Sequence, residues 1–528
     1  MELPNELLNI FMNKNDNNTE KKSPEDKQDH ELNLEDRMHL ISKNIEDNKT
    51  INLYNTLSNS RNITDYKHKS SINEYVYDDI EFNQDHYMDH NKSLFEKINK
   101  CNTKIGSLLL KKILMNPIKT IEQLKIRQSY LEKINKIHKE LEFHIQNIKM
   151  IENDLIWFWD DNNIRHIDLM HDMVYFNWNV IPFFNVGESL NNNETALLVS
   201  NIYKILISPI LTSLTPIVSL LVPLVLLIYF NKKTGNVLSW KTIIYNYFKT
   251  MFGNDTMKVL IKNPTQANLA SLATKGLYLF MYFQNIYYSI QSSSNTNKVV
   301  NIIHDKLNKM NLYIKHSIEI NRICKSVGLD DFKSYYDYNN IENNIHHYDN
   351  NYFMYKVFNK TPGLFTNKGK ILKVFKDFRM EKDNIINIFN YNGVVDVLLS
   401  INSLLINSTN ENPYILTKFV NSKAPKLNCE NIWHPYLTKD VTNDVIKNSV
   451  NVDKNMLITG PNAAGKSTFI KSIIINIILA QTIGVNSASF FSLTPYHLIE
   501  TYLHIPDVKG SSSLFEAEML RSKEYIEK

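Results

Sequence analysis

One segment near the end of the sequence constrains the fold more than any other. Residues 460–467 read Gly-Pro-Asn-Ala-Ala-Gly-Lys-Ser and match the pattern Gly-x-x-x-x-Gly-Lys-Ser/Thr. The short apolar run Met456–Thr459 precedes this loop, and the Ile-rich run Ser467–Ala480 follows it. A phosphate-binding loop of this kind lies between a buried parallel strand and a helix. The sequence therefore predicts a strand–loop–helix unit.

The residue types in this loop suit a nucleotide bound with magnesium. Glycines allow the backbone amides to surround phosphate groups, the helix N-terminus adds positive potential, and Lys466 adds a charge. The Ser467 hydroxyl is placed to bind Mg²⁺, and Thr468 is placed near the inner phosphates. The candidate ATP-binding residues are therefore Gly460, Pro461, Asn462, Ala463, Ala464, Gly465, Lys466, Ser467 and Thr468, with Ser467 as the metal ligand.

Composition favours long helices elsewhere in the chain. Gly (13) and Pro (15) each make up under 3% of 528 residues, which is too few turn-formers for a sandwich, barrel or propeller. Apolar residues recur at helical spacing in three stripes, which we interpret as faces packed in a core. These stripes comprise Ile105, Leu108, Leu109, Ile113 and Leu114; Leu141, Ile145, Ile148, Ile151, Leu155 and Phe158; and Ile303, Leu307, Met310 and Ile314.

Charge and cysteine usage exclude little. The net charge of 59 − 55 = +4 neither requires nor excludes a nucleic-acid partner. Cys101, Cys324 and Cys429 are far apart, so neither a disulfide framework nor a zinc site is expected. With no secretory signal at the N-terminus, an intracellular, reducing compartment fits. Residues 13 to about 90 are rich in Asn, Asp and Lys, and we expect most of them to be disordered or loosely attached.

The run from Ile205 to Phe230 contains 26 residues without a charge, whereas about 20 suffice to cross a bilayer. Pro209, Pro216 and Pro223 lie seven residues apart and therefore on one helix face. Two interpretations stay open. The run is either a membrane segment or part of a helical pair buried inside a large soluble protein.

A second apolar stretch, Gly276–Ile290, is short for a full span. Between the two stretches lie seven lysines and a single acid, Asp255. Placing those lysines across the membrane would conflict with the positive-inside tendency. A re-entrant or interfacial hairpin on an anionic surface resolves the conflict, and so would lysines bound to phosphate backbones. The lysines are Lys232, Lys233, Lys241, Lys249, Lys258, Lys262 and Lys275.

Other groups of residues invite functional interpretations that are weaker. The histidine pairs His138/His144, His166/His171 and His346–His347 lack metal-ligand spacing, so we expect them to face solvent or cap helices. Trp157, Trp159 and Trp178 could stack on bases, but core or membrane-interface packing is the favoured interpretation. No nucleophilic set of Ser/His/Asp or Cys/His can be argued, and the catalytic residues stay unassigned.

Several ordered segments resemble the MutS family of mismatch-repair ATPases. Thr459–Asn462 together with Gly465–Thr468 is similar to the family's Walker A segment. Ala480–Gly484 is similar to the family's Ala-Gln-Ile-Gly segment, with one extra residue. Further segments resemble the family's helical core, the segments before its nucleotide site and, for Gly510–Met519, its downstream Ser-Thr-Phe-x-x-Glu-Met signature. They are Thr103–Leu109, Asn116–Pro117 to Arg127, Val395–Ile401, Asn412–Tyr414, Trp433–Pro435, Thr442–Asp444 and Gly510–Met519.

The resemblance covers about residues 95–190 and 300–528 and implies roles for two further residues. Asn443 would lie near the adenine of ATP, and Ser513 would face the γ-phosphate bound to a partner subunit. By resemblance the chain forms a homo- or heterodimer through ATPase domains, and its ligand is DNA.

The sequence also departs from the family. The N-terminal region is too short for mismatch-reading domains, and the apolar segments occupy the position of the DNA-gripping clamp. The family's Walker B acids would lie beyond Lys528, so a fragment, a split gene and a truncated sequence all stay open. We therefore expect residues 1–528 alone to bind ATP with Mg²⁺ yet to hydrolyse it at near-background rates.

The expected fold class is α plus α/β. A helical core with a long lever-like helix pair carries an apolar insert, and a partial P-loop (ABC-type) ATPase domain follows. The expected regions are 1–90, low complexity; 91–200, first half of the core; 201–295, apolar insert; 296–425, second half; and 426–528, ATPase domain.

Three functions stay open on the sequence. The first is a MutS-like ATP-binding protein that couples ATP to lever movement in a dimer on DNA. The second is a membrane-attached P-loop ATPase that has lost mismatch recognition. The third is a nucleotide-binding scaffold without turnover.

Overall fold

The structure is a computed structural model, and the residues it describes all belong to one unit, Leu53–Lys528. The described residues are 72, 74–82, 93–156, 173–176, 186–233, 239–247, 266–329, 332, 334–335, 341–348, 362–363, 365–380, 382–437, 445–503, 519 and 522–523.

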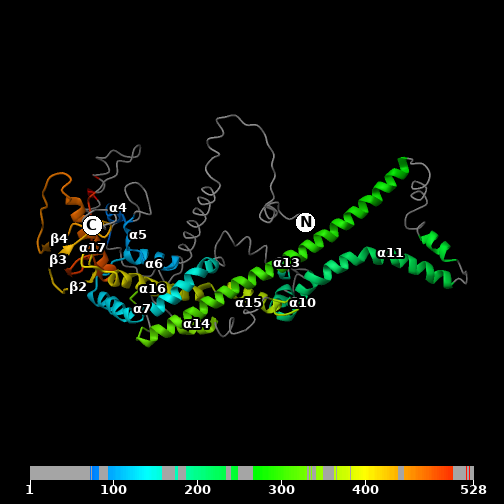
Figure 1. Ribbon diagram of the computed structural model, residues 1–528, viewed down its shortest axis with the longest axis horizontal. Coiled ribbons are helices and arrows are strands. Elements are labelled where there is room, and N and C mark those ends of the chain that lie inside the picture. The colour runs from blue at the N-terminus through cyan, green and yellow to red at the C-terminus, as the bar shows by residue number, and fades with distance from the viewer. Residues whose placement is uncertain are drawn as a thin grey trace. The chain divides into compact units, whose positions relative to one another are not determined.

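Helices dominate the described part of the chain (Figure 1). Their bounds are α4 Glu74–Asp79, α5 Leu94–Ile98, α6 Lys104–Leu114, α7 Ile121–Ile156, α9 Val186–Asn191, α10 Glu194–Ile202, the π-helix η3 Tyr203–Ile207, α11 Ser208–Lys233, α13 Gln266–Ser326, α14 Ile341–Tyr348, α15 Lys368–Met380, α16 Lys382–Ile406 and α17 Lys466–Ile483.

The helical stripes predicted from the sequence form the core. The α13 residues Ile303, Leu307, Met310 and Ile314 are fully buried, and α13 packs against α7. The α6 helix begins after the N-cap Thr103 and ends before Asn116, as predicted. It packs on α16, which also packs on α7. The predicted helices are therefore confirmed, apart from Phe158, which lies outside the described residues.

A buried carboxylate from α16 holds the start of α6. Asp396 accepts hydrogen bonds from the backbone amides of Asn102 and Thr103, at 3.0 and 2.8 Å, and from the Thr103 hydroxyl at 2.7 Å. A Cβ added at Gly106 would lie 2.3 Å from the Asp396 carboxylate, so only glycine fits there. Two segments that resemble the MutS family, Thr103–Leu109 and Val395–Ile401, therefore meet at this carboxylate.

A second carboxylate completes the capping of α6. Glu152 of α7 accepts hydrogen bonds from the amides of Lys104 and Ile105, at 2.8 and 3.0 Å. Burial raises the pKa of the Glu152 carboxyl, and repulsion from Asp396 adds to this rise. Burial also raises the pKa of Asp396. The first-turn amides of α6, which have no partners within the helix, thereby join three helices.

The strands build a mixed sheet in the C-terminal part of the chain. The four-stranded sheet has the order β2-β6-β3-β4, with β2 and β6 parallel and the other pairs antiparallel. A separate antiparallel pair joins β1 and β5. The strands are β1 Ile415–Leu416, β2 Lys418–Phe419, β3 Leu427–Ile432, β4 Asn448–Val452, β5 Val485–Asn486 and β6 Phe490–Leu493.

The strand predicted over Met456–Thr459 is not formed, and that prediction is wrong. These residues carry no regular structure, and Leu457 is 89% exposed. A strand needs a neighbour to pair its backbone groups. Among the described residues, no strand pairs with this run. The helix predicted after the loop is confirmed as α17.

Part of region 1–90, which the sequence predicts to be mostly disordered or loosely attached, packs in the core. Ile72, Val76, Tyr77, Ile80 and Phe82 are buried in the hydrophobic core. Their apolar side chains offset the ordering entropy that the surrounding polar composition cannot. Most of region 1–90 lies outside the described residues.

Removing the Asp396 carboxylate should destabilise the fold strongly. In Asp396→Ala, the buried amides of Asn102 and Thr103 lose their acceptor, so the free energy of unfolding should fall by about 3 kcal/mol. Urea denaturation of the full chain measures this. The matched control Asp305→Ala removes an exposed carboxylate from α13 and should cost no more than about 0.5 kcal/mol. Equal losses in both variants would contradict the capping role.

Candidate nucleotide site

The phosphate-binding loop leads directly into α17. Gly465 is the N-cap of that helix and adopts φ 81°, in the left-handed region that favours glycine. Ala463 also has a positive φ, of 62°. The loop is closed by a hydrogen bond from the Ala464 amide to the Pro461 carbonyl, at 3.3 Å. The first amides of α17 have no acceptor within the helix, so they can bind an anion.

The side chains of the loop leave room for a ligand. Gly460 through Gly465 are exposed, and a Cβ added at Gly465 would meet no atom within 4 Å. Lys466 folds back and donates to the carbonyl oxygens of Gly460 and Pro461, at 2.8 and 2.6 Å. The Ser467 and Thr468 residues, on the first turn, are exposed. The structure thus brings the nine candidate loop residues together, and their donor groups fit phosphate and magnesium.

The other end of α17 is buried and holds the connection between α6 and α7. The side chain of Gln481 donates to the carbonyls of Ile118 and Tyr496, at 3.1 and 2.9 Å. It also accepts from the Tyr496 amide at 2.9 Å, and the Ile118 amide donates to the Gln481 carbonyl at 2.7 Å. The segments around Asn116–Pro117 and Ala480–Gly484, both similar to the MutS family, are therefore in contact.

Arg127 of α7 reinforces this junction. Its guanidinium is buried and donates to the Thr482 carbonyl, and it also donates to the Ser334 carbonyl at 2.8 Å. The guanidinium lies 4.2 Å from the centre of the Tyr335 ring. The next residue, Gln128, donates to the carbonyl of Gly484 at 2.9 Å. The last turn of α17 is therefore attached to the first turns of α7.

The segment Trp433–Pro435 also lies against α17. Trp433 is fully buried, and its indole donates to the Pro413 carbonyl at 3.1 Å and packs edge-on against Tyr414. The Asn476 side chain of α17 donates to the Trp433 carbonyl at 3.3 Å. Two more segments that resemble the family, Asn412–Tyr414 and Trp433–Pro435, thus pack together beside the nucleotide helix.

His434 is an uncharged histidine in this region. Its Nδ1 accepts the Tyr436 amide at 3.3 Å. Burial lowers the pKa of His434 to about 4, helped by the positive charge of Lys471 and opposed by Glu81. Lys471 of α17 and Glu81 themselves form an ion pair at 2.5 Å. The imidazole therefore stays neutral at physiological pH.

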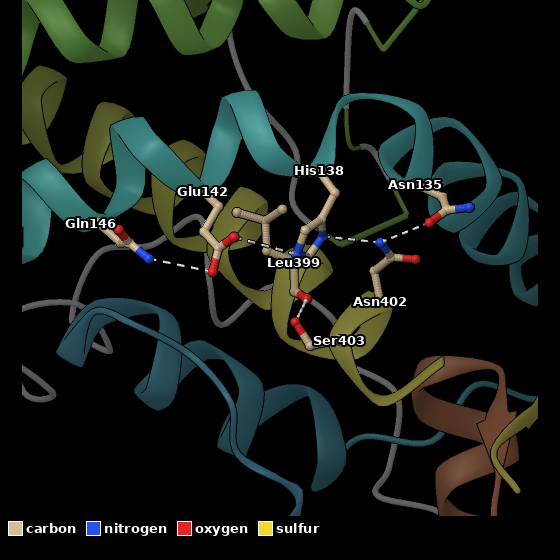
Figure 2. A network of polar contacts seen from close by, with 7 residues as sticks. All are labelled: Asn135, His138, Glu142, Gln146, Leu399, Asn402 and Ser403. Carbon is tan, nitrogen blue, oxygen red and sulfur yellow. Dashed lines mark hydrogen bonds and ion pairs between the residues drawn. The ribbon is translucent and has the colours of Figure 1, made fainter. Parts of the chain in front are cut away.

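Histidines on the long helices bridge neighbours, contrary to the expectation that they face solvent or cap helices. Figure 2 shows His138 of α7 between Asn402 of α16 and Glu142, with His138 Nδ1 3.0 Å from the Asn402 amide nitrogen. His144 and His316, on α7 and α13, have their Nδ1 atoms 3.0 Å apart. Helix packing brings these rings together over long sequence separations. Within the described ranges, no cluster of three or more His, Cys, Asp or Glu could hold a metal.

Several predicted residues cannot be located. Asn443 and Ser513, the two nucleotide residues implied by family resemblance, lie outside the described residues, as do Trp157, Trp159, Trp178, His166 and His171. Sequence reasoning missed the roles of Glu152, Gln128 and Arg127. A polar residue on an otherwise buried helix face was the available signal, because such a group needs a partner.

Comparison with known proteins gives partial matches to the MutS family, while no family model matches the chain. A mitochondrial DNA mismatch repair protein mutS homolog of Sarcophyton glaucum is 36% identical over 92 residues, 17% of this chain and 9% of that protein. The MutS protein homolog 4 of Homo sapiens is 31% identical over 131 residues, which are 24% of this chain and 13% of that protein. The DNA mismatch repair protein MutS of Streptococcus uberis is 27% identical over 124 residues, which are 22% of this chain and 14% of that protein.

These matches relate the chain to MutS proteins over about a fifth of its length. The matched stretch spans about a tenth of each relative, between 9% and 14%. The resemblance recognised in the sequence motifs is thus supported at the level of a family relationship.

The neutral state of His434 should produce a measurable pH dependence. Its pKa of about 4 lies below the ordinary value of 6.5, so the unfolded chain binds the proton first as pH falls. The stability from this group is complete above pH 6.5 and is lost as pH falls towards 4, by at most about 3 kcal/mol. In His434→Gln, urea denaturation should show a smaller loss of the free energy of unfolding between pH 6.5 and pH 4 than in the parent. His346→Gln, an exposed control on α14, should behave as the parent; an unchanged His434→Gln profile would refute the assignment.

Proposed function

We propose that this chain binds ATP with magnesium and transmits nucleotide occupancy to its long helices, as part of a MutS-related protein. The observation that carries the proposal is the course of α17. This helix starts at the phosphate-binding loop and ends in the hydrogen bonds that attach it to α7. Ligand binding at one end is thus connected to a lever-like helix at the other end by a single rigid element.

The chemistry of the loop supports ATP–magnesium as the ligand. The first-turn amides of α17 and the Lys466 ammonium are donors for the phosphates, and the Ser467 hydroxyl would take one position on the metal. To reach a phosphate, Lys466 must release the Gly460 and Pro461 carbonyls that it now binds. Asn443 would contact the adenine, and Ser513 would act across a dimer interface. Magnesium would neutralise phosphate charge; the proposal assigns no hydrolytic residue.

We further propose DNA as the ligand of the whole assembly and a homo- or heterodimer as its form, in an intracellular compartment. The support is the relationship to proteins named for DNA mismatch repair. Salt-dependent DNA binding by the full chain tests this part, because phosphate contacts release counterions.

A second candidate is a membrane-attached P-loop protein that has lost mismatch recognition. One observation favours it: α11 and the N-terminal half of α13 expose large apolar side chains. A nucleotide-binding scaffold without turnover would be distinguished from both by its ATP turnover.

Loss of the loop lysine should abolish tight nucleotide binding. Lys466→Ala removes the only side-chain cation of the loop segment 460–468, so the Kd for ATP–magnesium should rise at least about tenfold. Isothermal titration measures this. Lys454→Ala, an exposed lysine just upstream, is the matched control and should bind as the parent does. Equal affinity in the parent and Lys466→Ala would contradict the ATP proposal.

Weakening the contact between α17 and α7 should leave ATP binding intact but reduce the response of α7 to ATP. Arg127→Met keeps the side-chain volume but loses the donors to Thr482 and Ser334. ATP affinity should stay within about twofold of the parent. The ATP-dependent change in hydrogen exchange of α7 should shrink, whereas the exposed control Arg322→Met should retain it. A parent chain in which ATP leaves α7 exchange unchanged would refute the coupling.

A further inference from the structure

Two helical segments form what we call the apolar arm: α11 (Ser208–Lys233) and residues Gly276–Asn297 of α13. The α13 portion contains 22 consecutive residues without a charge, and α11 has none before Lys232. The two segments are in contact, and just before α11 the Ile205 carbonyl of η3 accepts a hydrogen bond from the Ser293 hydroxyl. Beyond this contact, α11 bends and the two helices separate (Figure 1).

The arm leaves its apolar side chains uncovered. Eleven large apolar side chains on α11 are 45–59% exposed, and nine on α13 are 49–73% exposed. Leu224, Leu227 and Ile228 on α11 are only partly exposed. The exposed side chains are Ile210, Leu211, Leu214, Ile217, Val218, Leu221, Val222, Val225, Leu226, Tyr229 and Phe230 on α11, and Leu277, Tyr278, Leu279, Phe280, Met281, Phe283, Tyr287, Tyr288 and Ile290 on α13. A contiguous surface of this kind requires a partner.

Burial separates this arm from the other apolar helices. Three described helices are long and apolar enough to cross a membrane. The stretches in Ile385–Ile406 and Lys466–Ile483 are 89% and 56% buried, so protein covers most of their surface. The stretch in Glu194–Val218, which leads into α11, is only 17% buried. Protein therefore leaves this helix largely uncovered in the described structure.

Two hydroxyls of α13 donate hydrogen bonds across to α11, whereas Gln284 and Asn285 on the same helix are exposed. The Tyr282 hydroxyl of α13 donates to the Ser213 carbonyl at 2.9 Å. The Ser289 hydroxyl donates to the Thr212 hydroxyl at 3.3 Å. Such bonds between helices, with apolar groups outside, are typical of segments in lipid.

Three hydroxyls in the first two turns of α11 are satisfied within the helix. Thr212, Ser213 and Thr215 each donate to the carbonyl four residues earlier. A hydroxyl bonded in this way presents its carbon atoms outward and needs no water. The outer surface of α11 therefore carries few unsatisfied polar groups.

The ends of α11 match the two surfaces of a bilayer. Tyr203 precedes the helix and is half exposed, and Tyr229, Phe230 and Lys232 lie near its end. The neighbouring Lys204 donates instead to the carbonyls of Met173 and Tyr175. The 26 residues of α11 span about 39 Å, more than the hydrocarbon thickness of about 30 Å. Tyrosines at both ends of an uncharged helix, with lysines at its C-terminal end, are typical of membrane anchoring.

We propose that the apolar arm inserts into a lipid bilayer, with α11 in the hydrocarbon layer and the lysines at its end among anionic headgroups. The uncharged surface gives a DNA backbone no cation to bind between the two ends of α11. The hydrogen bonds between the two helices and the length of α11 favour lipid over a second copy of the chain. The inference does not depend on nucleotide binding.

Flotation of the full chain with vesicles tests this inference. The detergent-purified chain is reconstituted with phosphatidylcholine vesicles, with and without phosphatidylserine, and should float with both and more completely with the anionic lipid. The double variant Leu214→Glu/Leu221→Glu places two charges on the exposed surface of α11. Its vesicle partition coefficient should fall at least about a hundredfold.

A matched control carries the same change outside the arm. Phe143→Glu/Met150→Glu replaces two exposed apolar residues of α7 and should float as the parent does. A parent that does not float, or a glutamate variant that floats as well as the parent, overturns the inference. A detergent-free dimer that the glutamate variant dissociates would also overturn it, because a second copy would then cover the arm. ATP titration of every variant reports separately on the nucleotide proposal.

Discussion

The contact between the last turn of α17 and the first turns of α7 is the constraint on which the described structure depends. It joins the part of the chain that carries the strands to the long helices. The contact is polar and buried, because the side chains of Arg127 and Gln481 donate hydrogen bonds to backbone carbonyls. A carbonyl at a helix C-terminus carries negative partial charge, which a buried guanidinium satisfies well. Losing that partner would leave buried groups unpaired on both sides, so the junction is far more specific than apolar packing alone.

Local patterns in the sequence predicted the helices but not what holds them together. The spacing of Ile303, Leu307 and Met310 suffices to predict a buried face, because helical periodicity is a local property. No local pattern indicates that Asp396 caps a helix almost 300 residues earlier, or that Arg127 reaches Thr482. Family resemblance came closest, since it selected segments on both sides of these contacts. The loop Gly460–Thr468 could be located in the sequence because its residues are consecutive, and its ligand stays a prediction.

The missing strand before the loop shows where a local pattern fails. Met456 and Leu457 look like a strand because they are apolar and short of turn-formers, yet they are exposed without regular structure. A helix satisfies its own backbone, whereas a strand takes its partners from elsewhere. The same run of residues therefore specifies a strand only where neighbouring strands are present. The exposed apolar residues of this run differ from those of α11 in their backbone. The backbone of α11 is hydrogen-bonded within a helix, whereas residues 456–459 belong to no helix or strand.

The helix α17 and the apolar arm are connected through α7 and α13. The α13 helix runs without interruption for 61 residues, from the arm to its packing against α7, with a single glycine and no proline. Lys306 and Lys309 of α13 both pair with Asp154 of α7, and His316 meets His144. By contrast, α11 begins at a π-helical turn and contains Pro216 and Pro223. A displacement of α7 would therefore pass along α13 as a rigid rod, and α11 would absorb the bending, because prolines and π-turns are where helices bend. If both proposals hold, an arm held in lipid would resist at one end the motion that ATP binding would drive at the other.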